Sequence, residues 1–162
     1  MNKTIFIYFS YSGDNDNFAN ILQRELNCDI LKLQPEKKYT NSSIKILFQG
    51  GNEALRKKAP ALIPYNFDSS KYSTIIFGTP VWAWTLSPVI RTFLQDNTIS
   101  NKDIVLTCSH RGSPGHTIDN LIQLLPNNNI IFNQEIHAPI ADNYEIIQII
   151  DGIKKAREVA SD

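Results

Sequence analysis

The sequence predicts a doubly wound α/β fold, in which a parallel five-stranded sheet lies between two layers of helices. Short apolar runs rich in β-branched residues alternate along the chain with segments of helical periodicity. Polar loops that contain glycine or tryptophan follow the first, third and fourth expected strands. The 162 residues suit one domain, residues 1–162, which is long enough to bury a full core. Because sheets of this class bind ligands beyond the carboxyl ends of their strands, the sequence predicts a small-molecule site at these loops.

The first part of the chain is expected to form two strands and a helix between them. Residues 4–9 are β-branched and aromatic, as in a buried strand, and residues 28–33 form the second expected strand. The helix is predicted by apolar side chains at helical spacing, which are Phe18, Ile21, Leu22 and Leu26. Two short helices, residues 42–48 and 52–58, are expected in the less regular stretch that follows.

The rest of the chain continues the alternation of strand and helix. Three apolar segments are expected to be strands, and they are residues 72–77, 103–108 and 130–136. The third strand is expected to end at Gly78, and Ser87 with Pro88 supplies a cap and a first-turn proline for the next helix. Apolar side chains at helical spacing predict two further helices, at residues 118–125 and 145–160.

The charges and cysteines exclude some classes of protein. Lys and Arg together number 16, as do Asp and Glu, so the formal net charge is zero. A neutral chain has no overall field that would draw it to nucleic acid or to an anionic membrane, and we expect neither as a partner. Cys28 and Cys108 are too few for a disulfide scaffold. No segment has the pattern of a signal peptide or the length of a membrane span, so we expect a cytoplasmic protein.

The loop after the first strand has the composition of an anion-binding turn. Hydroxyl groups, a glycine and the start of a helix coincide there, so unpaired N–H groups and the helix dipole point to one place. The loop lacks the Gly-Lys-Ser/Thr sequence of a nucleotide-binding P-loop, and an ordinary capped turn is the alternative interpretation. The candidate binding residues of this loop are Ser10, Tyr11, Ser12, Gly13, Asp14 and Asn15.

The loop after the third strand carries both tryptophans of the chain. Exposing two indoles is costly unless they cover something, and their faces suit stacking on a flat aromatic ring. The alternative is that one or both belong to the local core, and we expect one structural tryptophan and one at the site. The candidate residues of this loop are Thr79, Pro80, Val81, Trp82, Ala83 and Trp84.

The loop after the fourth strand adds glycines, which let a backbone approach a ligand closely, and several polar donors. Its candidate binding residues are Cys108, Ser109 and Gly112, with His110 and Arg111 as neighbouring donors. Zinc is not expected, because Cys108, His110 and His116 lie on one loop without a second pair of ligands. No residue of the chain stands out as catalytic.

Together the three loops resemble those of the flavodoxin family, in particular flavodoxin-like proteins with a short Ser-x-Ser-Gly-Asn-Thr phosphate loop. Residues 10–15 are similar to that loop, and residues 80–84 with Pro88, Phe93 and Leu94 are similar to the family's middle section. The resemblance covers essentially the whole chain in order and implies the strand order 2-1-3-4-5.

The resemblance implies noncovalent FMN as the cofactor, with its isoalloxazine ring between the second and third loops and against Trp82 or Trp84. Such a protein transfers electrons or is a small flavin-dependent reductase, because the flavin carries the redox chemistry. The sequence does not specify the redox partner, and a homodimer is a candidate assembly because flavodoxin-like reductases often dimerise. The implied phosphate ligands are Ser10, Ser12, Gly13 and Asn15.

The first loop departs from the family's pattern. Asp14 stands where Asn is usual, Asn15 stands where Thr is usual, and Asp16 follows. Carboxylates repel a phosphate dianion, so one alternative is a flavodoxin-fold binding module that has lost or weakened FMN binding. A third hypothesis is hydrolase or transferase chemistry at Cys108 or His110. The zero net charge argues against a dedicated electron carrier that docks on basic partners.

Overall fold

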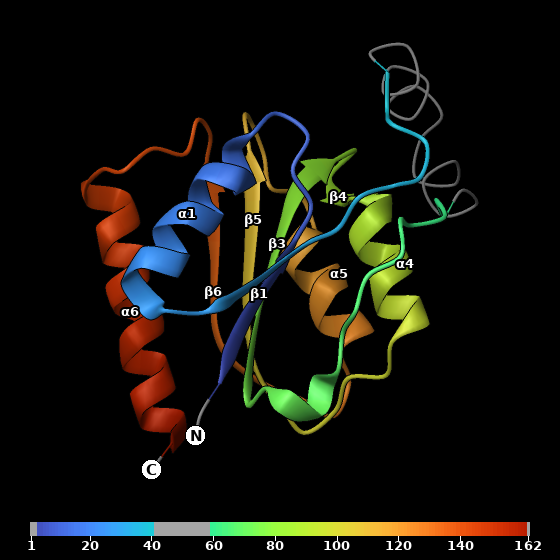
Figure 1. The fold of residues 1–162 in the computed structure, drawn as a ribbon. Coiled ribbons are helices and arrows are strands. Elements are labelled where there is room, and N and C mark those ends of the chain that lie inside the picture. The colour runs from blue at the N-terminus through green and yellow to red at the C-terminus, as the bar shows by residue number, and fades with distance from the viewer. Residues whose placement is uncertain (1–2, 41–58, 162) are drawn as a thin grey trace.

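The structure is a computed structural model that describes residues 3–40 and 59–161. The two short helices expected at residues 42–48 and 52–58 lie outside the described residues. A parallel sheet forms the centre of the fold, and its strand order β2-β1-β3-β5-β6 confirms the predicted doubly wound arrangement (Figure 1). Its strands are β1 (Thr4–Tyr8), β2 (Asp29–Lys32), β3 (Thr74–Trp82), β5 (Asp103–His110) and β6 (Asn129–His137).

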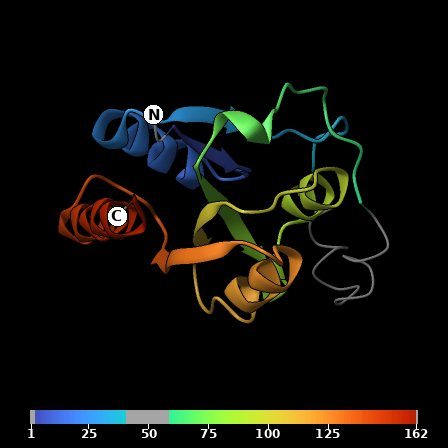
Figure 2. The same ribbon diagram turned by 90° about the horizontal axis from the view of Figure 1, so that it is seen from below.

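Helices cover both faces of the sheet. Viewed along the strands, α1 and α6 lie on one side, and α4 and α5 lie on the other (Figure 2). Each pair closes its own core, because one buried cluster joins β-strand residues to α4 and α5 and a second joins them to α1 and α6. The helices are α1 (Asp14–Leu26), α4 (Pro88–Asp96), α5 (Thr117–Leu124) and α6 (Tyr144–Ser161), with a 3₁₀ turn, η1, at Ser69–Lys71.

The central strands are apolar on both faces because both faces are covered. Every residue of β1 is buried, and so are Ile75, Ile76 and Phe77 of β3. The start of α4 follows the sequence signal, since the Ser87 hydroxyl accepts a hydrogen bond from the Ile90 N–H and Pro88 occupies the first turn. The buried sheet therefore gives the loops that follow its strands fixed starting points.

The expectation that the third strand ends at Gly78 was wrong. Residues Gly78, Thr79 and Pro80 continue the parallel ladder with β5, and the strand runs on to Trp82. It then turns back into β4 (Thr85–Leu86), a two-residue strand that pairs antiparallel with β3. Proline fits here because its fixed φ is compatible with an extended backbone. Glycine is required at position 78 because a Cβ there would collide with the Phe6 ring.

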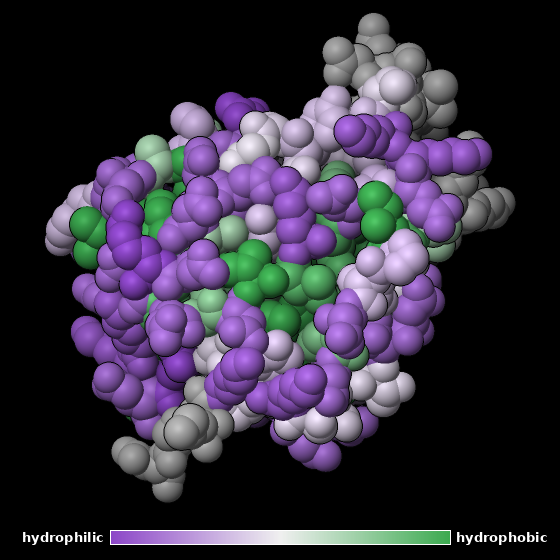
Figure 3. All heavy atoms as spheres, in the orientation of Figure 1, coloured by the Kyte–Doolittle hydropathy of each residue, from purple (hydrophilic) through white to green (hydrophobic). Residues whose placement is uncertain are grey.

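The surface seen in Figure 3 is mostly hydrophilic, with apolar side chains gathered near its middle. β2 is an edge strand of the sheet, and its Ile30 and Leu31 are only partly buried. Polar residues around such a region limit how far a neighbouring chain could extend the sheet. Within residues 3–40 and 59–161, no helix combines the length and apolarity needed to cross a membrane.

Candidate functional site

A cavity of about 680 Å³ lies beyond the carboxyl ends of β1, β3 and β5. We call it the carboxyl-end cavity. The three loops singled out in the sequence contribute to its wall, together with Ala138, which follows β6. The strand order reverses between β1 and β3, so the cavity occupies the place where doubly wound folds bind ligands.

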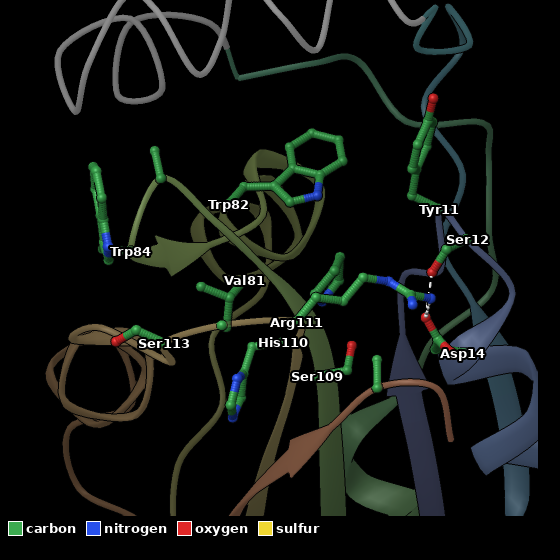
Figure 4. A pocket seen from close by; sticks show the side chains of 14 residues that line it. Tyr11, Ser12, Asp14, Val81, Trp82, Trp84, Ser109, His110, Arg111 and Ser113 are labelled. Atoms are coloured by element: carbon green, nitrogen blue, oxygen red, sulfur yellow. Dashed lines mark hydrogen bonds and ion pairs between the residues drawn. The ribbon is translucent and has the colours of Figure 1, made fainter. Parts of the chain in front are cut away.

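The first loop presents three of its six candidate residues to the cavity, and they are Tyr11, Ser12 and Asp14. The Tyr11 side chain is exposed, while the Asp14 side chain is almost wholly buried. Figure 4 shows Ser12 and Asp14 on the side of the cavity opposite Trp84. The first loop therefore supplies the polar side of the cavity.

The remaining candidates of the first loop shape its backbone. Ser10 accepts a hydrogen bond from the Asp16 N–H at 3.3 Å, and the Asn15 side chain donates to the Phe9 carbonyl oxygen at 2.9 Å. Gly13 is the N-cap of α1 with φ of 93°, a left-handed conformation that glycine adopts without strain. None of these three residues lines the cavity, and the N-cap residue Gly13 offers no side chain to the first turn of α1. Among the described residues Ser10 engages the Asp16 N–H, so the Asp14 and Asn15 N–H groups of the first turn are left for another acceptor.

The carboxylate of Asp14 is held by three donors. It accepts hydrogen bonds from the Ser12 hydroxyl, from the Ile140 N–H at 3.1 Å and from the Arg111 guanidinium at 2.8 Å. Burial opposes its ionisation, but these hydrogen bonds and the Arg111 charge outweigh burial and lower the pKa of Asp14 below its ordinary value. The carboxylate is therefore ionised and paired at neutral pH.

The neighbouring Asp16 is also paired. Its carboxylate contacts the Lys32 ammonium group at 2.6 Å and accepts a hydrogen bond from the Tyr8 hydroxyl at 2.9 Å. Burial and this contact with Asp16 raise the pKa of Tyr8. The two acidic residues that made the first loop look unfavourable for phosphate are thus each matched by a cation.

The two tryptophans of the second loop differ sharply in exposure although both line the cavity. Trp82 is 4% exposed, and its ring meets the edges or faces of Phe9, Tyr11 and Tyr39 at centroid distances of 5.6, 6.0 and 4.8 Å. Trp84 is 68% exposed. One indole is therefore fixed by an aromatic cluster, and the other projects into solvent at the cavity (Figure 4).

The backbone that carries Trp84 is held in a tight turn. Ala83 and Trp84 both have positive φ, 48° and 61°, which suits a two-residue hairpin but is unusual for side-chain-bearing residues. The Trp84 carbonyl oxygen accepts a hydrogen bond from the His116 N–H at 2.9 Å. Gly115 packs so closely that a Cβ there would overlap Trp84. Gly115 and His116 therefore hold the backbone of Trp84, which carries the exposed indole.

The other candidates of the second loop divide in the same way. Pro80, Val81 and Ala83 line the cavity, whereas Thr79 is fully buried below it. The Thr79 hydroxyl accepts a hydrogen bond from the Ser87 N–H at 2.9 Å, which ties the end of β3 to the start of α4. Thr79 therefore positions the loop.

The third loop lines the cavity with Ser109, His110, Arg111, Gly112 and Ser113. Of these, Ser113 was not selected from the sequence, and His110 and Arg111 were named there only as neighbouring donors of Ser109 and Gly112. Ala138 was also missed, and nothing in the sequence placed the segment after β6 near the other loops. For the third loop, the available signal was position, because each missed residue lies next to one that had been selected.

His110 carries an unusual ring nitrogen. Its Nδ1 is buried and has no hydrogen-bond partner among the described residues, which is rare for a buried polar atom. The imidazole meets His137 edge to face, with ring centroids 5.4 Å apart. A residue of the cavity wall therefore carries a buried nitrogen that the described part of the chain does not satisfy.

Cys108 stays out of the cavity wall and is 1% exposed. Burial, with a smaller contribution from Glu135, raises the pKa of its thiol to about 12. A thiol in this state is a poor nucleophile at neutral pH, which weighs against hydrolase chemistry at Cys108. Across residues 3–40 and 59–161, no cluster of three or more His, Cys, Asp or Glu side chains is arranged to hold a metal ion.

Residues 3–141 match the family described as flavodoxin. This chain belongs to the flavodoxin family. The match covers most of the chain and includes all three loops of the carboxyl-end cavity. It confirms the resemblance on which the sequence interpretation rested. No curated protein matches the sequence.

Solved structures share the fold at low sequence identity. A candidate flavoprotein of Bacteroides uniformis has a TM-score of 0.79 at 21% identity, covering 93% of this chain and 98% of its own. One from Bacteroides eggerthii has a TM-score of 0.75 at 20% identity, covering 95% and 99%. A flavoprotein of Lactobacillus acidophilus, solved in complex with FMN, has a TM-score of 0.69 at 18% identity, covering 83% and 93%. These similarities establish the flavodoxin fold.

Proposed function

We propose that this chain binds FMN noncovalently in the carboxyl-end cavity and acts in the cytoplasm as a small flavin-dependent reductase. The observation that carries the proposal is the cavity itself. One side is the first loop with the N-terminus of α1, and the other is built from two tryptophans and the third loop. A ligand with an anionic group at one end and a flat ring at the other suits both sides.

The residues present fit such a ligand in size and chemistry. About 680 Å³ lies within the range of small-molecule sites. The Asp14 and Asn15 N–H groups at the start of α1 suit a phosphate. Within residues 3–40 and 59–161, no atom lies within 4 Å of a Cβ added to Gly13, so the described chain leaves the space beside this residue open.

The chain's own groups would bind and orient the cofactor. Trp84 and Trp82 would contact the isoalloxazine ring, and Ser109 with the third-loop backbone would bond its polar edge. FMN supplies hydride and single-electron chemistry when bound, and the protein tunes it through stacking, hydrogen bonds and local charge. We assign no catalytic residue, because the redox step needs none from the protein.

A reductase fits better than a dedicated electron carrier. The formal net charge is zero, so the chain lacks the strong field that steers a carrier to an oppositely charged protein. The exposed indole of Trp84 at the cavity offers a flat apolar surface to a small aromatic acceptor. The redox partner is therefore proposed to be a small molecule, with a homodimer as the candidate assembly.

An absorbance spectrum tests the cofactor directly. The purified protein is mixed with excess FMN, passed through a desalting column and scanned. Flavin bands retained at about one per chain support the proposal, whereas a folded protein that retains none contradicts it. The flavin-loaded protein is then reduced chemically and mixed with benzoquinone or with cytochrome c. Faster reoxidation by the quinone supports a reductase, and faster reoxidation by cytochrome c supports an electron carrier.

The competing hypothesis is a binding module whose first loop no longer accepts FMN. This hypothesis rested on the negative charge of Asp14 and Asp16. Both carboxylates are paired with cations, which weakens that argument. Replacing Asp14→Asn and Asn15→Thr together distinguishes the two hypotheses. Flavin retention that arises only in this double variant supports the degenerate module, and retention already present in the unmodified chain supports the reductase.

A further inference from the structure

Arg111 spans the carboxyl-end cavity from the third loop to the first. Its guanidinium Nη2 lies 2.8 Å from Oδ2 of Asp14, across 97 residues of sequence. Figure 4 shows the side chain reaching from the region below Trp82 to the first loop, where the dashed lines join Asp14 to Arg111 and to Ser12. A cation from the third loop is therefore delivered to the loop that begins α1.

The two ends of this ion pair differ in their freedom. The Asp14 side chain is 9% exposed and is fixed by the Ser12 hydroxyl and the Ile140 N–H, whereas the Arg111 side chain is 61% exposed. Guanidinium carries five N–H donors in a planar fork, and among the described residues Arg111 uses one of its terminal nitrogens on Asp14. Asp14 thus orients the fork without using all of its donors.

We infer that Arg111, oriented by Asp14, binds the phosphate group of the cofactor and makes the site select FMN over riboflavin. The inference rests on the proposed function. The N-terminus of α1 alone would be an ordinary helix end, but here a positioned guanidinium adjoins it. Guanidinium and phosphate form charge-assisted hydrogen bonds, and a phosphomonoester is the part of FMN that riboflavin lacks.

This arrangement explains why an acidic residue is tolerated in the first loop. Oδ1 of Asp14 accepts the Ile140 N–H, and Oδ2 accepts both the Ser12 hydroxyl and the Arg111 guanidinium. The carboxylate is therefore engaged on both oxygens. Asp16 is neutralised separately by Lys32. Asp14 is a positioning residue, and Arg111 is the residue that meets the ligand.

The test compares two ligands that differ by the phosphate group. Wild type and Arg111→Ala are titrated with FMN and with riboflavin, and binding is followed by quenching of flavin fluorescence. Arg111→Ala should weaken FMN binding about 10- to 100-fold and riboflavin binding less than about threefold. Arg24→Ala is the matched control, because Arg24 is similarly exposed and pairs with Asp142 at 2.8 Å, and it should change neither affinity.

Two further variants test the orienting role of Asp14. Arg111→Lys keeps the charge but loses the planar fork, so it should recover only part of the FMN affinity. Adding Asp14→Asn to Arg111→Ala removes a buried carboxylate left without its cation, so the double variant should bind FMN about 10-fold more tightly than Arg111→Ala. Thermal unfolding of each variant establishes that it is folded.

The outcomes separate the two proposals. If the wild type binds neither flavin, the proposed function fails and this inference fails with it. If the wild type binds FMN but Arg111→Ala weakens FMN and riboflavin equally, or tightens FMN, the phosphate role of Arg111 is overturned while the function stands. If Asp14→Asn gives no recovery in the Arg111→Ala background, the coupling between the two residues is overturned.

Discussion

The carboxyl-end cavity and a second cavity at the opposite end of the same sheet have similar volumes, about 680 and 720 Å³. The second, which we call the amino-end cavity, is lined by residues 70–73, 101–103 and 127–129. These segments adjoin the amino ends of β3, β5 and β6. Volume therefore does not distinguish the two cavities, and the difference lies in their side chains.

Two asparagines of the amino-end cavity bond to neighbouring groups. Asn128 accepts a hydrogen bond from the Lys102 N–H at 3.1 Å and donates to the carbonyl oxygens of Ile99, Leu125 and Pro126. The Asn129 side chain donates to the Asp103 carboxylate, and neighbouring backbone groups pair across the same gap. These bonds hold the loops between strands together, so the hollow needs no ligand to account for its polar residues.

The carboxyl-end cavity is the reverse case. His110 Nδ1 is buried without a partner in the described chain, and the N-cap residue of α1, Gly13, offers no side chain to the first turn. Trp84 is exposed on a turn with positive φ, a conformation whose cost the surrounding contacts must offset. The comparison teaches that an unsatisfied group and an exposed indole on a tightly held backbone, more than size, distinguish the end of the sheet at which we propose that the ligand binds.

The largest expected effect separates the two tryptophans within the carboxyl-end cavity. Trp82→Ala removes a buried ring from an aromatic cluster, so the free energy of unfolding should fall by about 3–5 kcal/mol. Trp84→Ala should change stability by less than about 0.5 kcal/mol, because the indole is exposed, yet weaken FMN binding about 10-fold. Urea denaturation and flavin titration measure the two effects. Equal losses of stability would contradict the division between them.

Replacing Gly115 should disturb the turn that holds Trp84. Its φ is 57°, and a Cβ would overlap the Trp84 carbonyl oxygen, so Gly115→Ala should lower the free energy of unfolding by about 1–3 kcal/mol. Gly112→Ala is the matched control on the same loop, since no atom lies within 4 Å of its Cβ position. Urea denaturation compares the two variants, and similar effects would show that the packing at Gly115 is not decisive.

Asn128→Ala probes the amino-end cavity. Losing one accepted hydrogen bond and the two N–H donors of a partly buried amide should lower the free energy of unfolding by about 1–2 kcal/mol. FMN affinity should stay unchanged, because the residue lies at the far end of the sheet. Asn129→Ala, which removes one exposed bond to Asp103, is the control with the smaller expected loss. A change in flavin affinity without a change in stability would assign binding to the amino-end cavity.

The smallest effect concerns pH. Because the pKa of Asp14 is lowered on folding, its contribution to stability is present above the unfolded pKa of about 3.9 and is lost as pH falls through the folded pKa. Without flavin, wild type should exceed Asp14→Asn in the free energy of unfolding by about 1 kcal/mol at pH 7. This difference should shrink toward pH 2 in urea denaturation series. A difference that grows on acidification would reverse the sign of the assigned shift.

Local sequence signals found most of the fold. The start of α4 followed from Ser87 and Pro88, because capping depends on residues that are neighbours in the chain. The central strands followed from their apolar runs, since burial on both faces excludes polar residues. The end of β3 was misplaced, because Gly78 and Pro80 signal a turn locally while pairing with β5 keeps them in the sheet.

For the site, the sequence by itself determined which three loops gather at the carboxyl ends of the strands and the family to which the chain belongs. Only the tertiary structure decided that Trp82 is buried and Trp84 exposed, since both sit in the same local pattern. It alone paired Asp14 with Arg111 and with the Ile140 N–H, 97 and 126 residues away. The physical reason is that periodicity and capping act between near neighbours. The charge balance of a loop depends instead on groups that folding brings from distant parts of the chain.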